Sequence, residues 1–376
     1  MKIGMVCYPT YGGSGVVATE LGLQLAQRGH QVHFISYDRP FRLNEFRENV
    51  LLHEVGVSDY PLFRFPPYSI ALASTIVQVV KEHQLDVVHA HYAIPHAVSA
   101  YLAKQMLGGS LPVITTLHGT DITLVGSDRQ FFDITKFCIE QSDGVTTVSR
   151  QLAAETAETF DIGRPIKTIY NFIDPQTYQR DEKICRRSHF AQPEEKVIIH
   201  ISNFRPVKRI EDVVKVFYGI SQQIPSKLLL VGDGPDRAKA VDLVHELKIE
   251  GRVHFLGKQE GVVPLLSIAD LMLLPSEKES FGLVALEAMA CQVPVVATQV
   301  GGIPEVVQPG VTGCLAQVGD IAGMVNCGVR ILSDPHTYQA MRNKAREVAT
   351  TNFHVDTIVD EYEEFYVEVL NQMAKK

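Results

Sequence analysis

The chain has 376 residues, of which 45% are hydrophobic and 21% charged, a composition typical of globular proteins and not of disordered or fibrous ones. Its net charge of −8, without runs of basic residues, argues against a surface that coats nucleic acid or an acidic membrane. The length favours two domains. The residues before Pro9 are too few for a signal-peptide core, and no apolar run approaches the roughly 20 residues of a membrane helix, so we expect a cytoplasmic protein.

Short β-rich apolar runs alternate with helical patterns along the chain. In the first half, strands are predicted at 2–8, 31–37, 86–91, 112–118, 144–149 and 166–172, and helices at 16–28, 70–83, 96–106, 131–141 and 151–160. A polar, proline-containing stretch follows at 173–195 and is interpreted as a connection. Strands are then predicted at 196–202, 227–231, 252–256, 271–274 and 293–297, and a helix at 355–376.

This alternation predicts βαβ units, and hence an α/β protein with two Rossmann-like, doubly wound parallel-sheet domains. The predicted domains are 1–172, completed by the C-terminal helix at about 355–376, and 196–354. Ligands of such sheets bind at the carboxyl ends of the strands. Several polar and glycine-rich loops follow the predicted strands, so we expect one cleft between the two domains.

Metal and thiol chemistry are not expected. The six cysteines contain no C-x-x-C pair, so buried reduced thiols are predicted. No D-x-D triplet occurs, so the carboxylate pair that holds Mg²⁺ or Mn²⁺ in some sugar transferases is missing. His89 and His91 are expected on opposite faces of their strand, and no third ligand at suitable spacing accompanies them. We therefore predict neither a metal nor another cofactor.

The second half contains the sharpest motif, E-S-F-G-L-x3-E, placed between a predicted strand and a helix that begins near Gly282. A helix start offers free N–H groups and a positive dipole end to a diphosphate. Glu287 can accept hydrogen bonds from a ribose, and Glu279 from a second sugar, although two solvated glutamates on a surface helix are the alternative. The predicted donor-binding residues of this motif are Glu279, Ser280, Phe281, Gly282, Leu283 and Glu287.

Two cations follow the predicted strand at 196–202, in the run N-F-R-P-V-K. The residues of this run predicted to bind the donor are Asn203, Arg205 and Lys208. Arg205 can bind phosphate oxygens bidentately, and Lys208 adds a point charge. Their catalytic role would be to stabilise the charge that grows on a departing diphosphate. Solvated cations after a strand are the alternative, and Arg209 is the candidate for a structural role.

Two loops of the first half also follow strands. The run Gly12-Gly13-Ser14-Gly15 does not complete the G-x-G-x-x-G fingerprint, and this disfavours NAD binding. Its glycines either let the backbone come close to a bound anion or form a purely structural tight turn. The run His118-Gly119-Thr120-Asp121 ends an apolar strand, which places His118 at the expected cleft.

Together these motifs resemble the retaining glycosyltransferases of family 4, which have the GT-B fold, and the resemblance covers essentially the whole chain. It implies retention of the α configuration, independence from metal ions, and attack on the face from which UDP leaves. Glu279, Glu287, Arg205 and Lys208 take the donor-site positions of the family, and His118 that of its sugar-contacting histidine. Many members have a longer spacer between the Arg and the Lys, so which cation meets which phosphate stays open.

Within the family, the segments 7–15, 40–43, 89–92, 116–121, 170–174 and 202–205 are similar to enzymes that transfer N-acetylglucosamine from UDP-N-acetylglucosamine to L-malate in bacillithiol biosynthesis. The two carboxylates of malate require directed donors. The acceptor residues predicted on the first domain are Gly13, Ser14, Tyr92, Thr120, Asp121 and Arg42, the last of which is equally expected as a solvated arginine.

Three other functions remain open at this point. A UDP-N-acetylglucosamine 2-epimerase would share the fold, a dehydrogenase would use the loop at 12–15, and a family 4 glycosyltransferase could use another acceptor. The glutamate motif has no role in the dehydrogenase, which disfavours that alternative. The oligomeric state is likewise left open.

Overall fold

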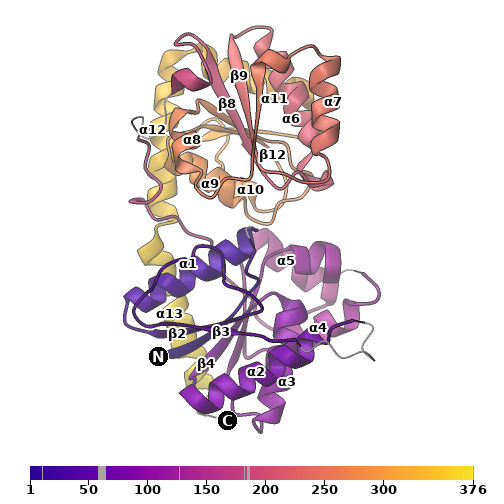
Figure 1. Cartoon of the computed structure of the whole chain (residues 1–376), viewed down its shortest axis with the longest axis vertical. Helices are drawn as coiled ribbons and strands as arrows, with labels where there is room; N and C mark the ends of the chain where they lie inside the picture. The colour runs from indigo at the N-terminus through magenta and orange to yellow at the C-terminus, as the bar shows by residue number, and fades with distance from the viewer. Residues whose placement is uncertain (11, 58–64, 127, 182, 184–186, 376) are drawn as a thin grey trace. The chain divides into compact units, whose positions relative to one another are not determined.

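The computed structural model describes residues 1–10, 12–57, 65–126, 128–181, 183 and 187–375. The chain divides into two compact units (Figure 1). Unit 1 comprises Met1–Asn171 and Asp356–Lys376, and unit 2 comprises Phe172–Val355. The described residues of the stretch 173–195 belong to unit 2. Among the described residues, no helix is both long and apolar enough to cross a membrane.

Unit 1 contains a seven-stranded parallel sheet in the order β3-β2-β1-β4-β5-β6-β7. Its strands are β1 Lys2–Val6, β2 Gln31–Ser36, β3 Val50–Glu54, β4 Val87–His91, β5 Val113–Leu117, β6 Gly144–Thr147 and β7 Lys167–Thr168. Its helices are α1 Gly13–Gln27, α2 Tyr68–His83, α3 Val98–Met106, α4 Phe132–Gln141, α5 Arg150–Phe160 and α13 Val355–Met373, with short turns η1 Ala93–Ala97 and η2 Asp121–Gly126.

Helices cover both faces of this sheet, because neighbouring residues of a strand point to opposite sides. In β2, Phe34 points toward α1, where a Cβ on Gly22 would lie 2.4 Å from its ring. The next residue, Ile35, joins the buried cluster formed with α2 and α3. Both faces are thus buried, which explains the nearly continuous apolar runs of the central strands.

Unit 2 contains a six-stranded parallel sheet in the order β10-β9-β8-β11-β12-β13. Its strands are β8 Lys196–Ile201, β9 Ser226–Val231, β10 Val253–Gly257, β11 Leu271–Leu274, β12 Val295–Thr298 and β13 Gly313–Ala316. Its helices are α6 Ile210–Ser221, α7 Arg237–Glu246, α8 Val263–Ile268, α9 Leu283–Ala290, α10 Ile303–Val306, α11 Ile321–Ser333 and α12 Pro335–Asn352.

The strand order reverses at one point in each sheet, between β1 and β4 in unit 1 and between β8 and β11 in unit 2. The loops after these strands leave the same edge of the sheet, where doubly wound domains bind ligands. In unit 2 these are the loops that carry Lys208 and Glu279, and in unit 1 those that carry Ser14 and Tyr92.

Two strands, β3 and β13, are absent from the sequence prediction. Both are the last strands at an edge of their sheets. The side chains of β3 are half-buried or exposed, and β13 has only four residues, one of which is a glycine. Neither forms an apolar run long enough to be distinguished from a loop.

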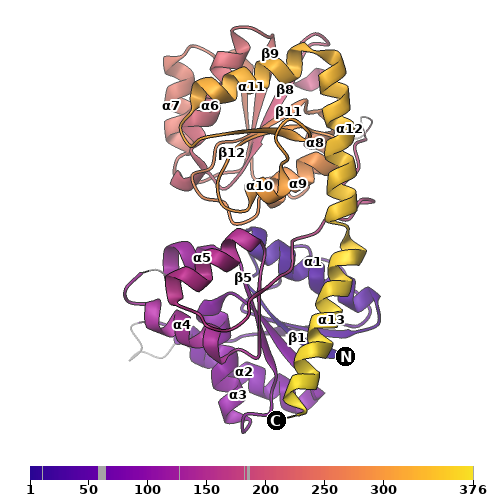
Figure 2. The same cartoon turned by 180° about the vertical axis from the view of Figure 1, so that it is seen from behind.

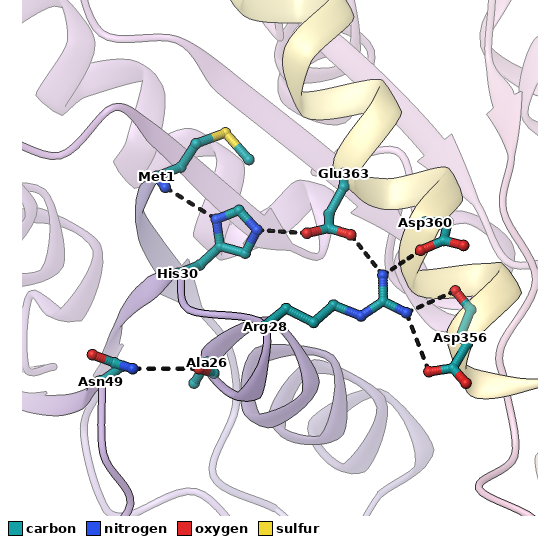
Figure 3. Close-up of polar contacts among 8 residues, drawn as sticks. All are labelled: Met1, Ala26, Arg28, His30, Asn49, Asp356, Asp360 and Glu363. Carbon is teal, nitrogen blue, oxygen red and sulfur yellow. Dashed lines mark hydrogen bonds and ion pairs between the residues drawn. The ribbon is translucent and has the colours of Figure 1, made fainter.

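The C-terminal helix α13 packs on the sheet of unit 1 (Figure 2). A Cβ on Gly144 of β6 would lie 2.8–2.9 Å from the ring of Phe365. At the end of α1, the guanidinium of Arg28 contacts Asp360, lies 2.6 Å from Glu363 and donates to the carbonyl of Asp356 at 3.0 Å (Figure 3). Apolar packing and this group of charges together hold α13 on unit 1.

The expectation of reduced thiols is wrong for one pair of cysteines. Cys314 in β13 and Cys327 in α11 form a disulfide, with Cα atoms 6.1 Å apart. The sequence gives no spacing signal for this pair, because the strand and helix come together only in the folded unit. Cys7, Cys138 and Cys291 are free and buried, and burial raises the pKa of Cys7 to about 12.

Candidate functional site

The two sharpest motifs of unit 2 meet in one ion pair. Lys208 lies in the short turn η4 Pro206–Lys208 after β8, and Glu279 follows β11, its neighbour in the sheet. The Nζ of Lys208 lies 2.5 Å from Oε2 of Glu279, and the two side chains are 19% and 16% exposed. The structure thus brings together two residues predicted to bind the donor, 71 positions apart in the chain.

The backbone around Glu279 is fixed by its neighbours. Its carbonyl accepts from the N–H of Gly302 at 3.0 Å, and a Cβ on Gly301 would lie 1.9 Å from the same oxygen. Ser276 Oγ donates to the Glu279 carboxylate at 3.4 Å. The glycine pair after β12 therefore permits a close approach that positions the loop of Glu279.

The other residues of the N-F-R-P-V-K run have different surroundings. Arg205 and Asn203 are exposed, and Phe204 is buried with φ at 40°. Arg209 donates from Nε to Oδ2 of Asp212 at 2.5 Å, within the first turn of α6. This pairing agrees with the structural role expected of Arg209.

The helix predicted near Gly282 is α9, which begins at Leu283. Gly282 precedes it with φ at 94°, and a Cβ there would lie 2.5 Å from Ile303. Phe281 is buried with its ring edge-on to Phe353, so only its backbone is placed to meet a ligand. Ser280 and Leu283 are half-buried.

Glu287 lies in the second turn of α9 and is 8% exposed. The hydroxyl of Tyr178 donates to its Oε1 at 2.7 Å. The backbone of Tyr178 is held in turn, because Arg346 donates to its carbonyl at 3.0 Å. A buried carboxylate needs a hydrogen-bonding partner, and Tyr178 supplies it. Tyr178 was not among the residues predicted from the sequence.

In unit 1, the loop after β1 leads directly into α1. Gly15 is required sterically, since a Cβ there would lie 2.5 Å from the carbonyl oxygen of Thr10. Gly13 and Ser14 form the first turn of α1; Gly13 is exposed and Ser14 half-buried. The first N–H groups of a helix lack intrahelical partners, so this turn can donate to an anion.

Histidine and tyrosine rings gather after β4 and β5. His118 Nε2 lies 2.9 Å from Nδ1 of His91, and the ring of Tyr92 lies 5.4 Å from that of His118. Tyr92 adopts φ at 93°, a strained value for a residue with a Cβ. Burial lowers the pKa of His118 to about 3, so its imidazole is neutral at pH 7.

The expectation that His89 and His91 point to opposite faces is wrong. Their rings lie 4.3 Å apart, and both are buried. Residues two apart in a strand share a face, so the pair should have been assigned to one side. His89 contacts Tyr366 of α13 at 2.8 Å, which gives it a packing role.

Asp121 is fully buried and bound by backbone amides. It accepts from the N–H groups of His118, Gly119 and Ala93 at 2.9–3.1 Å. Burial raises the pKa of Asp121 to about 6, although these three hydrogen bonds favour the charged form. Its oxygens fix the loop of His118, and the neighbouring Thr120 is half-buried.

Arg42, predicted as a carboxylate clamp, is paired within unit 1. Its Nη1 lies 2.8 Å from Oε1 of Glu20 in α1. Its charge is therefore partly offset by Glu20, which weakens the case for a role in acceptor binding.

His96, which the sequence prediction did not assign, also lies beside the rings after β4. It is buried, 2.5 Å from the carbonyl of His91, with its ring 4.4 Å from that of Tyr8. His96 lies in the short turn η1, five residues after His91, and no periodic pattern in the sequence indicates that the two residues are close.

Comparison with known proteins identifies the family. Residues 11–177 match the model of Glycosyltransferase Family 4, and residues 181–348 match that of Glycosyl transferases group 1. N-acetyl-alpha-D-glucosaminyl L-malate synthase of Bacillus anthracis is 52% identical over 371 residues, which are 98% of this chain and 97% of that protein. The uncharacterized glycosyltransferase MJ1607 of Methanocaldococcus jannaschii is 29% identical over 397 residues and 100% of both chains.

Among solved structures, Anabaena Alr3699/HepE in complex with UDP and glucose has a TM-score of 0.83 at 22% identity, covering 97% of this chain and 99% of that one. This likeness concerns the fold. The expected fold class, two parallel-sheet α/β domains as in GT-B enzymes, is confirmed. With a relative more than half identical along nearly its whole length, the chain belongs to the family 4 glycosyltransferases.

Proposed function

We propose that this glycosyltransferase transfers N-acetylglucosamine from UDP-N-acetylglucosamine to the hydroxyl of L-malate, with retention of the α configuration and without a metal ion. The observation that carries the proposal is the 52% identity, over 98% of the chain, to a protein named for that product. The epimerase alternative has no comparable support. A relative named for another acceptor, the D-inositol 3-phosphate glycosyltransferase of Mycobacterium bovis, is far more distant, at 27% identity over 388 residues.

The geometry of unit 2 supports the donor half of the proposal. Lys208 is held in a poorly solvated position by Glu279, where a cation acts on a diphosphate more strongly than it would in water. The exposed Arg205 follows the same strand and supplies a second cation. Two cations can supply the positive charge that Mg²⁺ supplies in D-x-D enzymes, which is the reason for proposing a metal-free reaction.

The motif at the start of α9 is proposed to make the remaining contacts with the donor. We assign the ribose to Glu287, whose position is fixed by Tyr178, and a hydroxyl of the transferred sugar to Glu279. In the part of the chain that the structure describes, no side chain caps the N–H groups at the start of α9, because the N-cap residue is Gly282. They suit the negative charge of a diphosphate.

Residues of unit 1 are proposed to bind the acceptor. The first turn of α1, with Gly13 and Ser14, offers N–H and O–H donors to a carboxylate, and Tyr92 and Thr120 add hydroxyls. His118 is neutral, so it acts as a hydrogen-bonding partner of a sugar or acceptor hydroxyl and not as a fixed cation. Asp121 holds the backbone of this loop through the N–H groups of His118 and Gly119.

The deciding experiment offers UDP-N-acetylglucosamine to the purified protein with a panel of small hydroxy acids and identifies the products by mass spectrometry. We expect a product with L-malate and α linkage, UDP release that depends on malate, and full activity in excess EDTA. Conversion of the nucleotide sugar without any acceptor would instead indicate an epimerase. Loss of activity with EDTA, restored by Mg²⁺ or Mn²⁺, would overturn the metal-free mechanism.

A further inference from the structure

Three histidines from three elements of unit 1 meet at a place that the transfer reaction does not use. His33 lies in β2, His53 in β3 and His83 at the end of α2. None of them belongs to a motif that the sequence predicts to be functional. They are 20 to 50 positions apart in the chain, so only the folded sheet and its covering helix bring them together.

The three imidazoles form a closed triangle. Ring centroids are 5.1 Å apart for His33 and His53, 4.5 Å for His33 and His83, and 5.1 Å for His53 and His83. His33 Nδ1 lies 2.9 Å from His53 Nε2. One ring nitrogen from each histidine can be chosen so that all three lie within 4.8 Å of one another.

These distances are close to those of a metal site. A tetrahedral ion with metal–nitrogen bonds of about 2.0–2.1 Å places its ligand nitrogens about 3.4 Å apart. His33 is fully buried and fixed in the sheet, whereas His53 and His83 are half-buried. The proposed site therefore requires the half-buried rings of His53 and His83 to rotate toward His33, and their partial exposure leaves a path for an ion and a water ligand.

The cluster is incompletely satisfied without a ligand. The Nε2 of His33 is buried and has no hydrogen-bonding partner among the described residues. A neutral imidazole has one donor and one acceptor nitrogen, so a contact at Nδ1 alone leaves the other nitrogen of His33 unpaired.

Two charges lie near the cluster. Lys2 donates from Nζ to the backbone carbonyl of His83 at 2.9 Å, and its charge disfavours a nearby cation. Glu82 lies 4.0 Å from Nε2 of His83 and has the opposite effect. The two charges therefore act on a bound cation in opposite directions.

We propose that His33, His53 and His83 bind one divalent transition-metal ion of the zinc class, in a site distinct from the residues assigned to sugar transfer. Three imidazoles suit Zn²⁺, Co²⁺ and Ni²⁺ and do not suit Mg²⁺ or Ca²⁺, which prefer oxygen ligands. The ion would join the edge strand β3 to β2 and to the last turn of α2, and thereby stabilise this side of unit 1. The inference is independent of the proposed transfer reaction.

The test uses full-length protein without a histidine tag, treated with EDTA and desalted. Isothermal titration calorimetry with Zn²⁺ should show one ion per chain, and Co²⁺ should give the visible absorption of a tetrahedral site. Loss of a residue that only hydrogen-bonds to a metal ligand weakens metal binding about 10–100-fold, so loss of a ligand itself in His53→Gln or His83→Gln should weaken it at least tenfold. His336→Gln is the matched control, because His336 is exposed on α12 of unit 2.

A second measurement does not depend on the calorimetric signal. Zn²⁺ at about 100 times its Kd should raise the Tm of the wild type by about 5–10 °C. The shift should persist in His336→Gln and fall to about half or less in the two ligand variants, whose folding is checked by circular dichroism. Absence of Zn²⁺ binding in the wild type would overturn the proposal. So would equal affinity in the wild type, His53→Gln and His83→Gln.

Discussion

Replacement of Lys208 by Met is expected to lower kcat about a hundredfold in a protein that still folds. The Nζ of Lys208 lies 2.5 Å from Glu279, and both side chains are less than one-fifth exposed, at 19% and 16%. Loss of one well-placed donor to a developing negative charge costs about 3 kcal/mol, which corresponds to roughly a hundredfold in rate. Since that charge is larger in the transition state than in the bound donor, kcat should change more than KM.

The same substitution has a separate effect on stability. It leaves the carboxylate of Glu279 without its cation, at a cost of about 1–3 kcal/mol in the free energy of unfolding. This is below the cost of breaking a fully buried pair, because both side chains keep some access to water. Adding Glu279→Gln to Lys208→Met removes the unpaired charge. The double variant should therefore recover stability without recovering kcat.

The assay measures UDP release with saturating UDP-N-acetylglucosamine and malate, together with thermal unfolding of each variant. Arg209→Met is the matched control, because it removes an adjacent cation that is bound to Asp212. Its kcat should stay near that of the wild type. The reasoning is refuted if Lys208→Met keeps a kcat within about threefold of the wild type, or if Arg209→Met loses as much activity.

Five further substitutions test the donor site, the acceptor site and the packing of α13. Glu287→Gln should raise the KM for the donor about tenfold with a smaller change in kcat, because a ribose contact exists in ground and transition states alike. Tyr178→Phe removes the hydroxyl that donates to Glu287 at 2.7 Å, so it should also raise the KM for the donor, but less. Tyr92→Phe and Ser14→Ala should raise the KM for malate, while UDP affinity measured by calorimetry stays unchanged; weaker UDP binding with unchanged malate KM would contradict the assignment. Arg28→Ala should lower the Tm by about 2–4 °C, because the ion pairs of Arg28 with partly exposed carboxylates on α13 contribute about 1 kcal/mol to the free energy of unfolding. An unchanged Tm would show that packing alone holds α13 on unit 1.

The sequence predicted the central strands of both sheets well, and the physical reason is burial on both faces. β8 and β11 are apolar along nearly their whole length, and both were predicted to within one residue. The edge strands β3 and β13 were missed, because the side chains of β3 are half-buried or exposed and β13 has only four residues, one of which is a glycine. The disulfide between Cys314 and Cys327 was missed because it depends on how α11 packs on β13.

The pairing of Lys208 with Glu279 follows from topology once the strand order is known. Each residue lies in the loop after a strand, and those strands are neighbours at the point where the order reverses. Tyr178 could not be found in this way. It lies in a polar stretch without periodicity, and its contact with Glu287 spans 109 positions. Contacts of this kind depend on tertiary packing, which no local pattern encodes.

The ion pairs of unit 2 also bear on which cation meets the diphosphate. Two of the three basic residues after β8 already have a carboxylate partner, but the partners differ in kind. Asp212 lies in the first turn of α6 and fixes Arg209 to its own helix, three residues away. Glu279 belongs to the motif that we propose to bind the donor, so on that proposal a bound nucleotide sugar would contact both Glu279 and Lys208. An ion pair of this kind holds the lysine in position before the donor binds, and the lysine can exchange one anionic partner for another when it does. This favours Lys208, with the exposed Arg205, as the phosphate ligands and leaves Arg209 with the structural role.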